Sequence, residues 1–138
     1  MKHITAIALF AIASFAMADK SFAQDHAVRA TVPFDFTVGT KLLPSGTYTI
    51  KSESPQVIVI ENHDKPIAAL SLVLPDSKKS RNGGKLVFHK YGDQYFLSEI
   101  LCDSAEMNMA IPPSKLEKRT QLQNARLNTS TQTFVAAR

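Results

Sequence analysis

The fold is decided by residues 28–38, which read VRATVPFDFTV. Every even-numbered position in this stretch is apolar, and the odd-numbered positions are charged, polar or proline. Such alternation puts all the apolar side chains on one face of an extended strand, whereas a helix would spread them around its circumference. Pro33 has no N–H to donate, so we expect this strand to lie at an edge of the sheet, to bulge at Pro33, or to be divided there.

Further short strands are expected along the rest of the chain, separated by turn signals such as Pro44-Ser45-Gly46. They cover residues 47–52, 57–60, 67–74, 86–90, 94–101 and 131–136. The unbroken β-branched run at residues 57–60 is typical of a strand covered on both faces. The strand over residues 67–74 alternates as well. The apolar side chains that share one of its faces are Ala68, Leu70, Leu72 and Leu74.

One helix is expected late in the chain. Ser114 and Glu117 have the spacing of a capping box, and the helix should run from there to about Asn124. Because the strands do not alternate with helices, the pattern does not support a parallel sheet. The sequence therefore predicts a mainly β fold: a single antiparallel small barrel or sandwich of six to seven strands with one late C-terminal helix.

The first residues have the pattern of a secretory signal peptide. A basic start at Lys2 and His3 precedes an apolar run over residues 4–18, and small residues then lead to Ala23. We expect residues 1–23 to be removed, with cleavage after Ala18 as the alternative. Residues 24–138 would then form a single β-rich domain, exported to the periplasm or the extracellular space.

Composition excludes several classes of protein. The surplus of 16 Lys and Arg over 12 Asp and Glu is small and scattered, so we expect no binding to nucleic acid. The chain has one cysteine, so no internal disulfide can form. After the leader, no apolar run approaches the length of a membrane span, and the mature protein is expected to have none.

Few residues are arranged for chemistry. His89 and Cys102 lie on the same predicted hairpin and are weak candidates for a base and a nucleophile. Lys78, Lys79 and Arg81 form a basic stretch that is a weak candidate for binding an anionic envelope polymer or lipid headgroup. No catalytic motif, phosphate loop or metal-ligand spacing accompanies them, so we expect no catalytic, cofactor or metal site and no enzyme.

Four groups of residues carry a resemblance to a known family: 32–36 (VPFDF), 43–48 (LPSGTY), 85–98 (KLVFHKYGDQYFLS), and Pro113-Ser114 with Glu117. With these motifs the chain resembles a family of small exported acidobacterial-type β-rich proteins, to which no activity is assigned. The resemblance covers about residues 28–117. It implies a secreted β-rich fold with a late helix, and it carries over no catalytic or binding residue. The chain departs from the family pattern between Asp103 and Ala110, where a glycine and an arginine are expected.

Four functions are compatible with these features. The first is a non-enzymatic, exported module of the cell envelope that binds an unidentified partner or small ligand or has a structural role. The second is a small β-barrel that carries an apolar ligand inside. The third is an enzyme of unknown class. The fourth is assembly through an exposed edge of the first strand, which follows from Pro33.

Overall fold

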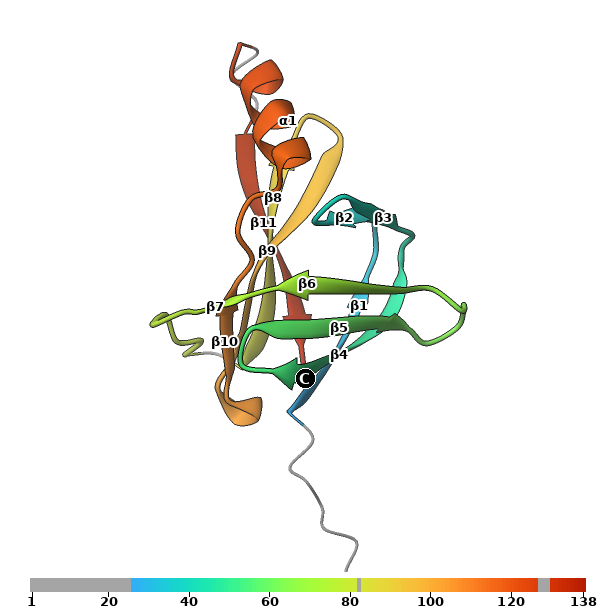
Figure 1. The fold of residues 1–138 in the computed structure, drawn as a ribbon, viewed down its shortest axis with the longest axis vertical. Helices are drawn as coiled ribbons and strands as arrows, with labels where there is room; N and C mark the ends of the chain where they lie inside the picture. Colours follow the sequence, from blue (N-terminus) through green and yellow to red (C-terminus); the bar gives the residue numbers. More distant parts are fainter. Residues whose placement is uncertain (1–25, 82, 127–129) are drawn as a thin grey trace, which may run out of the picture.

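The computed structural model describes residues 26–81, 83–126 and 130–138, and Figure 1 shows their arrangement. The signal peptide predicted at residues 1–23 lies outside the described residues. The mainly β fold with one late helix is confirmed. The strands are β1 (Ala27–Val32), β2 (Phe36–Val38), β3 (Lys41–Leu43), β4 (Gly46–Ser54), β5 (Val57–Asn62), β6 (Ala68–Leu72), β7 (Leu74–Pro75), β8 (Gly84–Tyr91), β9 (Gln94–Cys102), β10 (Met107–Ala110) and β11 (Ser130–Ala137).

The structure divides the described residues into more strands than the six to seven that were expected. The additional ones are short: β2 and β3 have three residues each, β7 has two and β10 has four. So few residues hold too little alternation to be recognised as strands in a sequence. A turn of 3-10 helix at Asp103–Ala105 joins β9 to β10.

The first predicted strand is divided at Pro33 into β1 and β2. Its alternation is confirmed in β1, where Val28 and Val32 are buried while Arg29 is exposed, but not in β2, where Thr37 is buried as well. The expectation that this strand lies at an edge is wrong, because β1 pairs with β4 on one side and with β11 on the other. The chain bends at Pro33 instead, and the missing N–H falls between the two strands.

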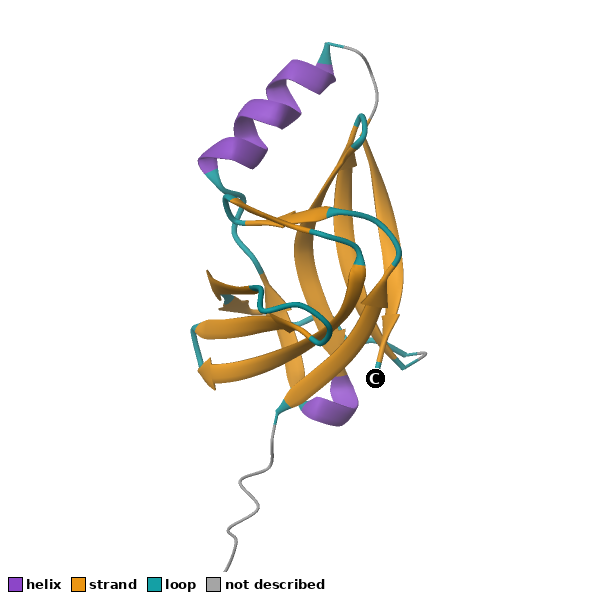
Figure 2. Ribbon diagram, turned by 90° about the vertical axis from the view of Figure 1, so that its right-hand side faces the viewer, coloured by secondary structure: helices purple, strands orange, loops and turns teal. Residues whose placement is uncertain are grey.

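The sheet curls into a nearly closed barrel, as Figures 1 and 2 show. Its strands follow the order β3-β2-β9-β8-β11-β1-β4-β5-β6. β10 pairs with β9 and also with β7, which follows β6 in the chain, so this short ladder connects β9 to the segment after β6 and closes part of the barrel. β3 and β6 remain at the two ends of the order, and we call the open line between them the seam.

Large side chains fill the interior of the barrel. The Phe36 ring meets the rings of Tyr48 and Phe88 edge-on, with centroids 5.1 and 5.4 Å apart. The largest fully buried side chains are Tyr48, Phe36, Phe88, Phe96, Leu43, Ile50, Ile58, Ile60, Leu86, Leu97, Ile100 and Met107. Each of them stabilises the fold by roughly 1.5–3 kcal/mol relative to its exposure to water.

The helix α1 (Lys115–Ala125) lies at one end of the barrel, beside β8 and β11 (Figure 2). The predicted capping box is confirmed, because Ser114 Oγ accepts a hydrogen bond from Glu117 N at 3.1 Å. The helix buries two polar residues, Glu117 and Thr120, and leaves Leu122 exposed. Among the described residues, no helix has both the length and the apolar character needed to cross a bilayer.

Candidate functional site

A row of leucines on β6 and β7 points away from the barrel. Leu70, Leu72 and Leu74 are 71%, 69% and 54% exposed, while Ala69 and Val73 between them are buried. The sequence prediction that these leucines share a face is confirmed, but the face is the outer one. We call these three residues the leucine row. Leu42 on β3, 67% exposed, lies across the seam.

At this point one edge of β6 has no described strand beside it. Asn62 N donates to Ile67 O, and Val73 N donates to Gln56 O, each at 2.9 Å. Along an antiparallel ladder, every second residue directs its N–H and C=O groups towards the neighbouring strand. On this side the residues are 67, 69, 71 and 73, whose N–H and C=O groups face β5. The N–H and C=O groups of Ala68, Leu70 and Leu72 therefore point into the seam. Within the described residues, β6 has no strand on that side.

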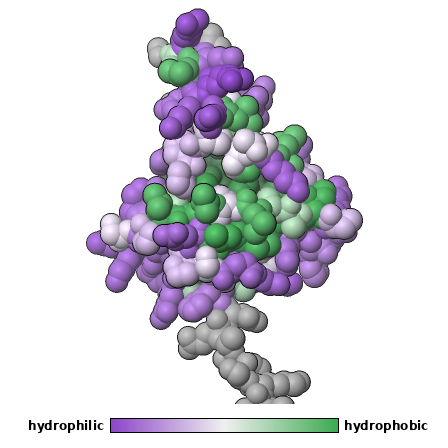
Figure 3. Space-filling view, viewed as in Figure 1, coloured by the Kyte–Doolittle hydropathy of each residue, from purple (hydrophilic) through white to green (hydrophobic). Residues whose placement is uncertain are grey.

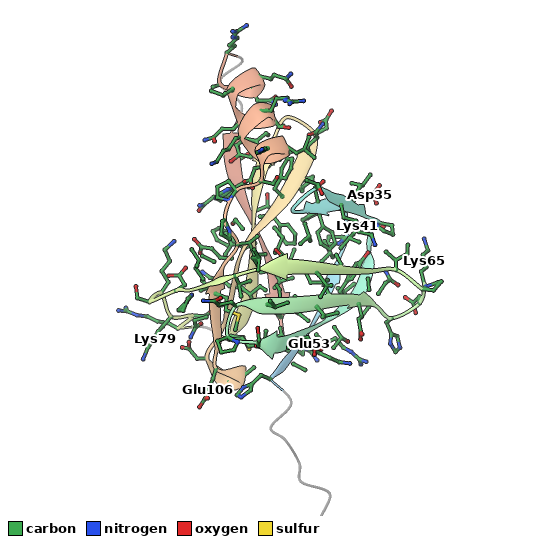
Figure 4. All side chains as sticks on the ribbon, in the orientation of Figure 1. Asp35, Lys41, Glu53, Lys65, Lys79 and Glu106 are labelled. Carbon is green, nitrogen blue, oxygen red and sulfur yellow. The ribbon has the colours of Figure 1, made fainter. Side chains whose placement is uncertain are left out.

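One side chain bridges the seam. Lys41 Nζ on β3 donates a hydrogen bond to Ala68 O on β6 at 2.5 Å. Figure 4 shows Lys41 beside the edge of β6 that β5 leaves free. The lysine thus satisfies a carbonyl that would otherwise accept an N–H from a neighbouring strand. Blocking a sheet edge with lysine is a common way to prevent uncontrolled strand pairing.

A groove runs along the seam, with a volume of about 350 Å³. We call it the seam groove. Its walls include Val38, Gly39 and Lys41 on the side of β2 and β3, Leu70 and Leu72 on β6, and Pro112 after β10. Figure 3, viewed as Figure 1, shows apolar side chains gathered over the face that β5 and β6 cross. Monomeric proteins rarely leave such a contiguous apolar patch exposed unless it contacts a partner.

His89, a candidate from the sequence, belongs to a polar cluster beneath α1. Its Nδ1 lies 3.1 Å from Glu117 Oε1, and Tyr91 OH donates to the same oxygen at 3.4 Å. Burial raises the pKa of Tyr91, and the Glu117 carboxylate beside it acts in the same direction. A shallow hollow of about 260 Å³ opens next to the cluster, with Gln121 in its wall. These polar contacts hold the helix against β8. The leucines of the helix are exposed and do not pack against the strand.

Cys102 does not lie near His89. It is fully buried at the end of β9, with Sγ 3.3 Å from Ser104 Oγ. A Cβ placed on Gly84, at the start of β8, would meet the same sulfur atom at 2.9 Å. His89 lies five residues further along β8, which is about 16 Å at the rise of an extended strand. The structure therefore does not bring the base and the nucleophile together.

The basic candidates Lys78, Lys79 and Arg81 are exposed in the loop between β7 and β8. Lys78 Nζ lies 2.5 Å from Glu99 Oε1, and this hydrogen bond raises the pKa of Lys78. Figure 4 shows Lys79 pointing away from the barrel. Among the residues with described positions, no group of three His, Cys, Asp or Glu side chains is placed to hold a metal ion.

The residues of the seam groove were not singled out as candidates from the sequence. Two signals were available: residues 67–75 carry no charge, and Pro66 and Pro75 bracket the leucine row. A charge-free strand with apolar residues on one face is typical of a core strand, so these signals do not by themselves indicate an exposed edge.

Comparison of the chain with protein-family models, curated proteins and solved structures finds no match. The resemblance to a family of small exported acidobacterial-type proteins therefore remains a prediction.

Proposed function

We propose that this protein is a non-enzymatic, exported module of the cell envelope that binds a partner through the leucine row and the seam groove. The observation that carries the proposal is the exposure of Leu70 and Leu72 on an edge of β6 that pairs with no other described strand. Exposure of two neighbouring leucines to water is unfavourable, and so is a strand edge with no strand beside it. A partner that covers both would remove these costs.

Two other functions weighed from the sequence have less support. An apolar ligand inside the barrel needs internal space, and the rings of Phe36, Tyr48 and Phe88 occupy it. An enzyme needs a reactive group beside its activating partner, whereas Cys102 on β9 lies beside Gly84 at the start of β8, five residues from His89. Export is supported by the sequence pattern of residues 1–23 alone.

The test is site-specific photocrosslinking in intact cells that produce the full chain. A photoreactive side chain is placed at position 70, in the leucine row, and in a matched variant at position 118, which is exposed on α1. We expect one discrete adduct from position 70 and none from position 118. Adding Leu72→Lys should remove the adduct while the protein stays at the same level.

Fractionation of the same cells tests export. The adduct should be found in the periplasmic or extracellular fraction, on protein whose mass shows the loss of residues 1–23. Equal labelling from positions 70 and 118, or an adduct that Leu72→Lys leaves unchanged, would contradict binding at the leucine row. Protein that keeps its leader in the cytoplasm would contradict export.

A further inference from the structure

The proposed function leaves open what covers the seam. Resting on that function, we propose that the seam groove takes one extended polypeptide segment of the partner, paired antiparallel to β6, with a carboxylate of that segment against Lys41. Four features of the seam support this pairing: the backbone groups of β6 that face it, its width, its two ends and its charge.

The backbone groups of β6 are placed for strand addition. The N–H and C=O groups of Ala68, Leu70 and Leu72 point into the seam, and their side chains point outward. A strand bound there gains main-chain hydrogen bonds, and every second side chain of it packs against Leu70 and Leu72. This combination of ladder and side-chain contacts is how exposed sheet edges recognise extended peptides.

The width of the seam favours a single strand over a second copy of this protein. A lysine side chain reaches at most about 6 Å from its Cα by standard bond lengths, and Lys41 Nζ lies 2.5 Å from Ala68 O. At this point the gap is therefore no wider than roughly two strand spacings of about 4.8 Å. The gap between β6 and β3 therefore has room for at most one strand. The β6 of a second copy would bring its own β5 into the position of β3, and the two would collide.

Both ends of the free edge are fixed. At one end Pro66, which has no N–H, ends the edge before Ala68. At the other end the same edge is already taken, since β7 pairs with β10 through Leu74 and Ala110. β10 pairs with β7, and the chain turns away from this edge at Pro112. The bound segment would pair with β6 in line with β10, starting where β10 ends. It pairs along the five residues of β6.

Charge sets the direction of the bound segment. Among the residues that line the seam groove, Lys41 is the one with a charge. When the bound strand supplies an N–H to Ala68 O, Lys41 loses its acceptor and needs another. In an antiparallel pairing the carboxyl-terminal end of the segment lies beside Ala68, so a carboxylate there can pair with Lys41. A parallel segment would bring its amino end to the same place, next to a like charge.

The test uses purified mature protein and a synthetic hexapeptide of alternating threonine and valine, labelled at its amino end. Binding is followed by fluorescence anisotropy. The peptide with a free carboxylate should bind roughly threefold to fivefold more tightly than the same peptide with an amidated end. Lys41→Met, which keeps an apolar stem, should remove that difference. An amidated peptide that binds the wild type as tightly as the acid would overturn the role of the carboxylate.

A matched pair of variants tests the strand pairing. Leu70→Pro removes an N–H that points into the seam and leaves the ladder with β5 intact, so binding should weaken about tenfold. Leu70→Thr removes the apolar side chain but keeps the N–H, and it should weaken binding less. Circular dichroism and thermal unfolding establish that both variants are folded. If Leu70→Pro does not fold, Leu72→Pro makes the same test.

The outcomes separate this inference from the proposed function. Equal weakening by the proline and threonine variants would overturn strand pairing and leave apolar contact with the leucine row in place. If the peptide fails to bind the wild type while position 70 still gives its adduct in cells, strand pairing is likewise overturned and the proposed contact with the leucine row is kept. Loss of both the peptide binding and the adduct would overturn the inference and the proposed function together.

Discussion

At the scale of single residues, Gly84 is the most constrained glycine. It begins β8, and a Cβ there would lie 2.6 Å from Ala137 O and 2.9 Å from Cys102 Sγ. The sulfur belongs to a side chain, whereas the carbonyl belongs to β11 and can shift only if the strand moves. The tight contact between β8, β9 and β11 at this point therefore depends on the absence of a side chain.

We predict that Gly84→Ala lowers the free energy of unfolding by about 1–3 kcal/mol, the usual cost of overpacking. Urea unfolding of the purified mature protein measures it. The cost should be smaller when Gly84→Ala is introduced beside Cys102→Ala, because one of the two close contacts is then removed. Wild-type stability in the single variant would show that β11 moves aside freely.

Tyr91 links stability to pH. Burial and the Glu117 carboxylate raise its pKa above the ordinary value of 10.0 in the folded protein. Between the two values the folded state holds a proton that the unfolded state has lost. The contribution of Tyr91 is therefore fully present below about pH 10 and is lost as the pH rises through the folded-state pKa.

The prediction is that Tyr91→Phe reduces the loss of unfolding free energy between pH 9 and pH 11, measured by urea unfolding at a series of pH values. Tyr48 and Lys78, whose pKa values are also raised, add losses of the same sign. Both groups are present in wild type and variant, so their contributions cancel in the comparison. Identical pH profiles for the two proteins would mean that Tyr91 titrates as it does in water.

At the scale of elements, α1 is held by its cap and by polar contacts. Ser114 caps the helix, Glu117 meets His89 and Tyr91, and Thr120 Oγ1 donates to Gln94 Oε1 at 3.4 Å. No apolar stripe anchors it, since Leu116 is 38% and Leu122 71% exposed. We therefore expect the helix to open separately from the barrel.

Ser114→Ala should cost about 1 kcal/mol of helix stability. We expect the amide of Lys118, which donates to Ser114 O at 2.9 Å, to exchange with deuterium about fivefold faster, while amides of β8 keep their rates. Lys115→Ala, which leaves the cap in place, is the matched control. A change in the β8 amides equal to that in α1 would show that the helix and the barrel open as one unit.

The strands show which parts of the fold can be derived from sequence. Alternation in residues 28–38 correctly assigned the buried face of β1, whereas all three residues of β2 are buried, Thr37 included. On β6 the same alternation placed Leu70 and Leu72 on one face, but it did not say whether that face points into the core or towards solvent. The direction comes from pairing with β5: Ile60 points into the core opposite Ala69, so Leu70, opposite Val59, points out. Pairing between strands is a tertiary property that a local pattern does not contain. For the same reason, Lys41 could not be connected with Ala68.

At the scale of the whole molecule, the leucine row is separate from the interior that stabilises the barrel. We predict that Leu70→Thr and Leu72→Thr each change the free energy of unfolding by less than about 0.5 kcal/mol, as exposed substitutions do. Ile60→Thr, on the neighbouring strand but fully buried, should cost about 2 kcal/mol or more. Urea unfolding of the three variants measures the contrast. A loss at Leu70 as large as that at Ile60 would mean that the row is part of the core.

The position of β11 has a consequence for biogenesis. It is the last of the described strands in chain order, yet in the wall it lies between β8 and β1. A ribosome releases residues 130–137 only after every other strand, so β1 and β8 wait for their shared neighbour until synthesis is nearly over. For a polypeptide that we propose to be secreted, we expect this delay to leave the barrel incomplete while the chain passes through a translocation channel.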